Sequence, residues 1–308
     1  MHVALACAGR RGYRFLCRLI ELAPTAQFTV FSFREEPHEP PFLDDIRSVA
    51  EKQGSFIETR KLDGPRGLRF WDQADVDLLL VVGWRYLISR AVYERPRRGS
   101  FVLHDSLLPR YRGFSPTVWA ICNGEDHTGA TLFTIADDVD SGTIIDQKRV
   151  EIGPEETIAT VVENVTQAYL SLLEHNLPNL LEGTAAGQPQ EESQRTYVPK
   201  RTEADNQIDW TWPTGRIHNL IRAVSAPYPG AFCQLRGRRL RVWSASRAVE
   251  QGVPGSNPPG AIIERIPEKG ALVQTGSGAI LLGLVQWEGD LPRCAAEALA
   301  DVIWPLGS

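Results

Sequence analysis

One histidine and one aspartate are placed where they could transfer a proton. His104 ends an apolar run and precedes a loop rich in turn-forming residues, 105–113. A second turn-rich loop, 136–142, contains Asp140 and follows the apolar run 131–135. A carboxylate beside an imidazole favours the imidazolium and holds the ring, which prepares a histidine for proton transfer. In the alternative interpretation His104 is a half-buried structural histidine and the aspartates are ordinary turn residues, and spacing alone leaves both interpretations open.

Short apolar strands must position these loops. The runs 76–83 and 100–104 are nearly continuous in apolar character, as in strands buried on both faces of a parallel sheet. The amino-terminal order of strand 2–8, helix 12–22 and strand 28–33 predicts a βαβ opening. We therefore expect an α/β fold with a Rossmann-like, doubly wound parallel sheet, in which ligands bind at the carboxyl ends of the strands. If the strands before the two loops are parallel neighbours, Asp140 faces His104.

A second, smaller domain should follow. Residues 155–181 predict a long amphipathic helix, and a polar stretch comes after it. Short alternating runs such as 240–243 and 271–274 then predict a small OB-like β-barrel preceded by a helix. We expect a catalytic domain at 1–185, a linker at 186–200 and a C-terminal domain at 201–308.

Several motifs in a fixed order resemble the folate-dependent formyltransferase family. His104 opens the motif HDSLLPRYRG, and it is followed by NGE at 123–125, TGAT at 128–131 and DVDSG at 138–142. Downstream, IDW at 208–210, HNLIRA at 218–223 and YPGAF at 228–232 resemble a C-terminal domain that methionyl-tRNA formyltransferases share with formyltransferases of amino sugars. The sequence around the YPGAF motif is closer to the formyltransferases of amino sugars. Separate motifs in the right order are far more specific than any single short motif.

The resemblance implies transfer of a formyl group from the co-substrate 10-formyl-tetrahydrofolate to an amine, without a metal. The family histidine aligned with His104 acts as general acid and base, and the aspartate aligned with Asp140 favours its protonated form. A family asparagine that helps to hold the oxyanion corresponds to Val102, whose side chain donates no hydrogen bond. Loss of one oxyanion donor typically costs about 10²–10³-fold in rate. Compensation could come from the protonated ring, a backbone N–H of the 105–114 loop, Ser106 or the substrate.

The resemblance also implies a folate site made mainly of backbone groups in two loops. Its positions are Tyr86, Leu87 and Ile88 in one loop, and Ala136, Asp137, Asp138, Val139 and Asp140 in the other. Phe114 stands where some amino-sugar formyltransferases carry an arginine. Stacking could replace that contact.

The molecule that receives the formyl group is expected to be a small amine. The net charge of −5 argues against broad capture of nucleic acid, and so against a tRNA acceptor. A nucleotide-linked amino sugar and an amino acid such as N-hydroxyornithine both remain open. Two other functions also remain open. They are hydrolysis of 10-formyl-tetrahydrofolate and, because of Val102, a non-catalytic relative.

Other features of the sequence concern the cellular location of the protein and its binding partners. The five scattered cysteines form no CxxC pair and suggest reduced thiols in the cytoplasm. No apolar run approaches the ~18 residues of a membrane helix. Four polar residues could line the acceptor side of a cleft or serve as structural staples: His218, Asn219, Arg222 and Tyr228. The sequence leaves a homo-oligomer open.

Overall fold

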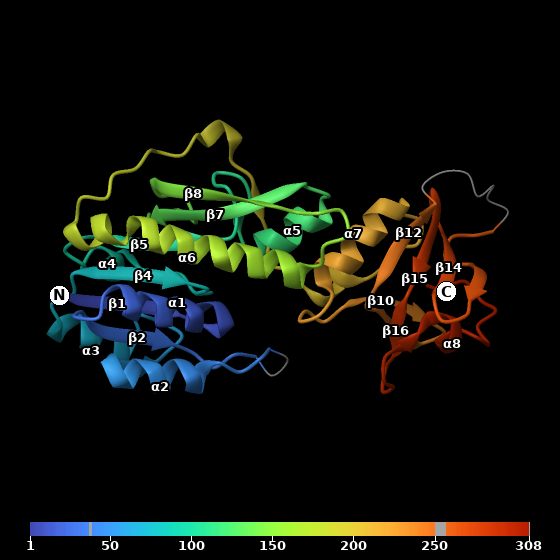
Figure 1. The fold of residues 1–308 in the computed structure, drawn as a ribbon, viewed down its shortest axis with the longest axis horizontal. Coiled ribbons are helices and arrows are strands. Elements are labelled where there is room, and N and C mark those ends of the chain that lie inside the picture. Colours follow the sequence, from blue (N-terminus) through green and yellow to red (C-terminus); the bar gives the residue numbers. More distant parts are fainter. Residues whose placement is uncertain (37–38, 250–256, 308) are drawn as a thin grey trace. The chain divides into compact units, whose positions relative to one another are not determined.

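The computed structural model describes residues 1–36, 39–249 and 257–307 (Figure 1). The chain divides into two compact units. The first contains Met1–Pro116, Thr128–Val150 and Glu163–Val198, and the second contains Thr117–His127, Glu151–Val162 and Pro199–Ser308.

A seven-stranded sheet forms the centre of the first unit, with the order β3-β2-β1-β4-β5-β7-β8 (Figure 1). Its strands are β1 (His2–Cys7), β2 (Gln27–Ser32), β3 (Gly54–Glu58), β4 (Leu78–Val82), β5 (Ser100–His104), β7 (His127–Thr134) and β8 (Ile144–Glu151). Strands β1 to β5 run parallel to one another, which confirms the predicted Rossmann-like α/β fold. Every residue of β4 is buried, as its continuous apolar run predicts.

Helices α1 (Gly9–Leu22), α2 (Leu43–Gln53), α3 (Pro65–Gln73) and α4 (Arg90–Tyr93) connect the parallel strands. Trp71 of α3 and Val92 of α4 share a buried apolar cluster with Val81 of the sheet. The predicted long helix is α6 (Ile158–Glu182), which is joined to α1 by an ion pair of 2.6 Å between Arg14 and Glu163.

One strand pair differs from the expectation. Strands β5 and β7 run antiparallel, with His104 opposite Thr131. The chain leaves β5 at its carboxyl end, passes through the short helix α5 (Pro116–Cys122) and enters β7 near that same end, so no crossover is needed. The connection after β7, residues 135–143, turns back and carries Asp140 to His104 without a parallel pair.

Part of the predicted polar linker is ordered and belongs to the first unit. It contains a 3₁₀ turn, η1 (Glu192–Gln194), and β9 (Tyr197–Val198), which pairs in parallel with β6 (Arg112–Gly113) in the loop after His104. We call residues 188–198 the strap.

The second unit has a helix followed by antiparallel sheets, as predicted. Helix α7 (Thr214–Val224) precedes two four-stranded sheets with the orders β10-β11-β16-β17 and β12-β15-β14-β13. The strands are β10 (Ala231–Leu235), β11 (Arg238–Val242), β12 (Ala245–Val249), β13 (Ile262–Ile266), β14 (Gly270–Thr275), β15 (Gly278–Leu282), β16 (Leu284–Trp287) and β17 (Arg293–Cys294). A short helix, α8 (Ala295–Ala298), follows them. Within the described ranges, no helix combines the length and the apolar character needed to span a bilayer.

Candidate active site

His104 and Asp140 lie together at the carboxyl end of β5. The Nδ1 atom of His104 is 3.6 Å from Oδ2 of Asp140, and Nε2 donates a hydrogen bond of 2.8 Å to the carbonyl oxygen of Tyr111. Because a carbonyl only accepts, Nε2 carries the hydrogen, and Nδ1 is the ring nitrogen that faces the carboxylate. At 3.6 Å the two groups are in electrostatic contact rather than hydrogen bonded. Catalytic contacts are often this long before substrate binds.

The backbone of both loops is held in unfavourable conformations. Tyr111 (φ 61°), Ser115 (φ 52°) and Asp140 (φ 52°) are three of the five non-glycine residues with positive φ in the described chain. Each such residue costs on the order of 1–3 kcal/mol, and such residues cluster at functional sites. Their concentration around His104 favours the catalytic interpretation over ordinary turns.

Gln190 of the strap joins the two loops. Its Nε2 donates to the carbonyl oxygens of Asp140 (2.7 Å) and Gly142 (2.8 Å). Its Oε1 accepts from Nε (3.0 Å) and Nη2 (2.7 Å) of Arg112. Gln190 is 8% exposed and Arg112 is 1% exposed. The amide therefore uses both of its donors and accepts two hydrogen bonds in a buried position. Sequence reasoning missed Gln190, because a glutamine in a polar stretch carries no sign of burial.

Arg112 continues this network to the surface. Its Nη2 lies 2.5 Å from Oε1 of Glu192, and its Nη1 donates to the Tyr197 hydroxyl at 3.1 Å. The hydrogen bond from Arg112, followed by one from Arg195, lowers the pKa of Glu192 to about 2. The buried Arg112 guanidinium is thus paired with the ionised carboxylate of Glu192.

The strap also contacts the backbone of the loop that follows His104. The Tyr111 N–H donates to Oγ1 of Thr196 at 2.8 Å. At Gly113 (φ 107°) an added Cβ would lie 2.3 Å from the Val198 carbonyl oxygen. Glycine is required there both for its backbone conformation and for this close approach.

Asp105 anchors the end of β5. Nη1 of Arg11 lies 2.5 and 2.7 Å from its two carboxylate oxygens, and the Tyr169 hydroxyl donates to it as well. Burial acts to raise the pKa of Asp105, but the Arg11 guanidinium outweighs it and holds this pKa below its ordinary value. Asp105 is therefore an ionised anchor between α1 and α6, not a proton acceptor. Its partners are far away in sequence, so the local motif gave no sign of them.

The first predicted folate segment is only partly exposed. The ring of Tyr86 packs edge-on against Phe33 at 5.1 Å, whereas Leu87 is 82% exposed. Ile88 packs against the apolar cluster of Trp71 and Val92.

The residue that precedes the second predicted segment packs against the same cluster. Val102 and Ile135, the residue before Ala136, both pack against it. Val139 is 42% exposed, and the Asp138 carbonyl accepts from the Ser141 hydroxyl at 2.9 Å. The Asp137 carboxylate is engaged by α4, where the Tyr93 hydroxyl donates to it and Arg90 Nη1 is 3.6 Å away. Ile88, Val102 and Ile135 thus pack against one cluster.

Most donors expected to replace an asparagine at position 102 are already engaged. The Ser106 hydroxyl donates to the Arg110 carbonyl at 2.7 Å, and the residue is 1% exposed. The backbone N–H groups of 108 and of 110–114 all donate to protein acceptors. Among the protein donors expected to bind the oxyanion, the His104 ring is therefore the one that we consider further.

The polar residues of α7 have structural partners in the second unit. Nε2 of His218 is 3.2 Å from Oε2 of Glu155, and Arg222 donates to the carbonyl oxygens of Gly153 and Glu156. Burial is the largest cause that lowers the pKa of both His218 and Arg222. These contacts lie within the second unit, so they give His218 and Arg222 structural partners there.

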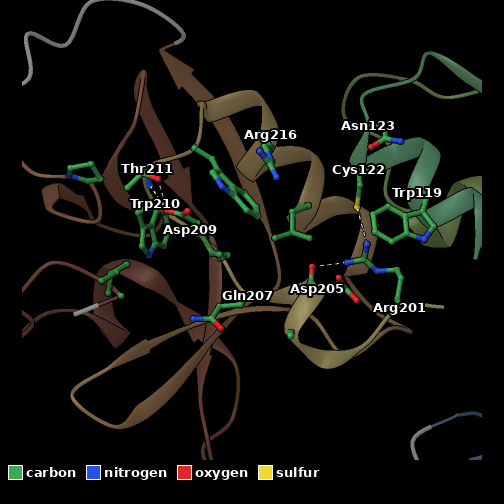
Figure 2. A pocket seen from close by; sticks show the side chains of 17 residues that line it. Trp119, Cys122, Asn123, Arg201, Asp205, Gln207, Asp209, Trp210, Thr211 and Arg216 are labelled. Atoms are coloured by element: carbon green, nitrogen blue, oxygen red, sulfur yellow. Dashed lines mark hydrogen bonds between the residues drawn. The ribbon is translucent and has the colours of Figure 1, made fainter. Parts of the chain in front are cut away.

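A cavity of about 720 Å³ lies in the second unit (Figure 2). Two of its guanidinium groups stack on indoles, Arg201 on Trp119 (4.6 Å) and Arg216 on Trp212 (3.8 Å). Asp209, one of its two carboxylates, accepts two hydrogen bonds from Thr211, and these hydrogen bonds lower the pKa of Asp209. The cavity offers planar cationic surfaces.

Comparisons with known proteins agree with this fold. The N-formyltransferase from Helicobacter canadensis, solved with folinic acid and dTDP-3-aminofucose, is 17% identical, with a TM-score of 0.68 over 91% of this chain and 98% of that chain. HypX from Aquifex aeolicus, solved with tetrahydrofolic acid, is 17% identical, with a TM-score of 0.63 over 97% of this chain and 47% of that chain. This chain therefore spans about half the length of HypX. Methionyl-tRNA formyltransferase from Clostridium thermocellum is 16% identical, with a TM-score of 0.58 over 80% of this chain and 94% of that chain.

The family matches cover most of the sequence. Residues 38–176 match the formyl transferase family, and residues 200–300 match the formyl transferase C-terminal domain. The two matches follow one another in the order that the motifs predict. The chain belongs to the folate-dependent formyltransferase family.

Proposed function

We propose that this protein is an N-formyltransferase that moves a formyl group from 10-formyl-tetrahydrofolate to an amine of a small molecule. The observation that carries the proposal is the His104–Asp140 pair, held at a strand end in a chain of this family. The folate ligands of the solved Helicobacter canadensis and Aquifex aeolicus proteins support the choice of co-substrate.

The reaction begins when a neutral amine attacks the formyl carbon. A new C–N bond forms, and the tetrahedral intermediate carries a negative charge on oxygen. Nδ1 of His104 takes the proton from the amine and gives it to the departing folate nitrogen as the old C–N bond breaks. Asp140 stabilises the imidazolium between these two transfers. We assign the transfers to Nδ1 because Nε2 stays bound to the Tyr111 carbonyl.

The oxyanion also needs a donor. Val102 offers none, and both Ser106 and the N–H groups of 108 and 110–114 are engaged. Once protonated, Nδ1 of His104 is the donor that we assign to the oxyanion. Much of the acceleration then comes from holding the amine against the formyl carbon, since effective molarity supplies up to ~7–11 kcal/mol.

We place the folate between the two loops that carry Tyr86 to Ile88 and Ala136 to Asp140. Exposed apolar side chains on this unit support that placement: Leu87 is 82%, Phe114 43% and Val139 42% exposed. Such side chains suit the flat face of a pterin.

The acceptor that we favour is a nucleotide-linked amino sugar, with an amino acid such as N-hydroxyornithine as the second candidate. The sugar nucleotide in the Helicobacter canadensis structure supports the first. The net charge of −5 weighs against tRNA. We also propose that residues 1–185 carry the catalysis and that the protein works in the cytoplasm.

The test is a turnover assay with 10-formyl-tetrahydrofolate and a panel of amines, reading tetrahydrofolate release and formylated product together. Formylated product that disappears in His104→Ala supports the transferase. Tetrahydrofolate released without dependence on an acceptor would instead identify a hydrolase. No product with any amine, from a protein that still binds folate, would identify a non-catalytic relative.

A further inference from the structure

Asp140 is one of four residues that form a closed ring of contacts. Gln190 donates to the Asp140 carbonyl and accepts from Arg112, and Arg112 is bonded through the chain to Gly113. The Gly113 N–H then donates to the Asp140 carboxylate at 2.8 Å. The ring fixes both the backbone and the side chain of the residue that faces His104.

We propose that Gln190 is a positioning residue of the formyl-transfer site, which sets the Asp140 carboxylate against Nδ1 of His104. The expected effect of Gln190 on kcat rests on the proposed function, because it assumes that the protein transfers a formyl group. Gln190 touches no reacting atom and acts through Asp140.

The conformation of Asp140 explains why it needs this support. Its φ of 52° is in the left-handed region, which residues other than glycine seldom adopt unless their surroundings impose it. Gln190 binds the carbonyl oxygens of Asp140 and Gly142, two residues apart, and so holds this turn at both ends. Without these two donors, buried carbonyls would lose their partners and the turn could relax.

The position of Gln190 is itself fixed. Arg112 is buried and donates two hydrogen bonds to its Oε1, so the amide cannot rotate without losing them. Arg112 is held in turn by Glu192 of the same strap. A rigid side chain between two strained loops is what a supporting residue of an active site requires.

The kinetic test compares Gln190→Met, similar in length but without hydrogen bonds, with Gln194→Met, which changes an exposed glutamine of the same strap. We expect Gln190→Met to lower kcat roughly 10- to 100-fold, because a misplacement of about 1 Å at an active site has effects of this size. KM for the folate should change less than kcat does, since Gln190 itself contacts no folate in the proposed site. Gln194→Met should match the wild type.

A double-mutant cycle separates positioning from general destabilisation. If Gln190 acts through Asp140, Gln190→Met should cost less than about threefold when Asp140→Asn is already present. An equal loss in both backgrounds, or an unchanged kcat in the single variant, would overturn the proposal. Gln190→Glu keeps the acceptor for Arg112 but loses the donors, so it should behave like Gln190→Met.

A second measurement does not depend on activity. Hydrogen exchange of the Gly113 amide reports its bond to the Asp140 carboxylate, and we expect exchange roughly tenfold faster in Gln190→Met than in Gln194→Met. Unchanged protection at Gly113 would show that Asp140 has not moved and would reject the inference. If wild-type protein transfers no formyl group, the proposed function fails, while this exchange measurement still decides the role of Gln190.

Discussion

Nε2 of His104 donates to the carbonyl oxygen of Tyr111 at 2.8 Å, so the imidazole presents Nδ1 to Asp140. This relationship fixes which ring nitrogen can exchange a proton. It also separates two roles of Asp140 that substitution can test: its charge and its backbone conformation.

Asp140→Asn removes the charge while keeping the conformation, because asparagine tolerates the left-handed region and can still accept the Gly113 N–H. We expect kcat to fall by roughly 10²–10³-fold, within the range for proton-transfer catalysis, while thermal stability changes little. Steady-state kinetics and a melting curve on the same preparation measure both. Asp75→Asn, which changes an exposed carboxylate outside both loops, is the control, and retention of full activity in Asp140→Asn would contradict the acid–base role.

Val102→Asn tests the missing oxyanion donor. Val102 packs against an apolar cluster, so an amide there should lower the melting temperature, yet it could reach the formyl oxygen. We expect kcat to rise about tenfold, less than the 10²–10³-fold that an aligned donor contributes. Val102→Ala, which loses packing without gaining a donor, should lose stability with no gain in rate. A stable Val102→Asn with unchanged kcat would show that position 102 does not face the oxyanion.

Asp105→Asn should destabilise the protein. It removes the negative charge that pairs with the partly buried Arg11 and weakens the hydrogen bond from Tyr169. We expect a loss of roughly 2–3 kcal/mol in the free energy of unfolding, measured by urea titration. Asp75→Asn breaks an exposed pair with Arg97 and should cost less than about 0.5 kcal/mol. Equal effects of the two variants would mean that Asp105 is not an anchor.

The Arg112–Glu192 pair predicts a dependence of stability on pH. The pKa of Glu192 is lowered from 4.5 to about 2, so its stabilising contribution is fully present above 4.5 and is lost as the pH falls toward 2. The difference in melting temperature between wild type and Glu192→Gln should therefore be largest at neutral pH and shrink across this window. Melting curves at a series of pH values measure it. A difference that stays constant across the window would show that ionised Glu192 does not stabilise the fold.

The sequence predicted the parts of the site that depend on short-range pattern. The strand that ends at His104 has the expected limits, and Asp140 does lie beside it. The parallel pairing expected to bring them together is wrong, because β7 begins at the end where β5 stops and no crossover helix intervenes. The apolar runs predict that the strands are buried. They do not predict whether two neighbouring strands run parallel or antiparallel, because that depends on the connection between the strands.

The supporting residues could not be read from the sequence. Gln190 and Arg112 are 78 residues apart, and Arg11 and Asp105 are 94 apart. Each looks like a surface residue in its own segment. Their burial results from tertiary packing, which no local pattern of polar residues records.

The strap has a consequence for the order in which the protein matures. As the polypeptide is synthesised, β5 and the loop that follows it are complete well before Gln190 exists. The nascent chain can assemble its parallel strands early, but the turn that contains Asp140 gains two of its hydrogen bonds only after the strap has been made. The turn that contains Asp140 is therefore completed only after every strand of the seven-stranded sheet has been synthesised.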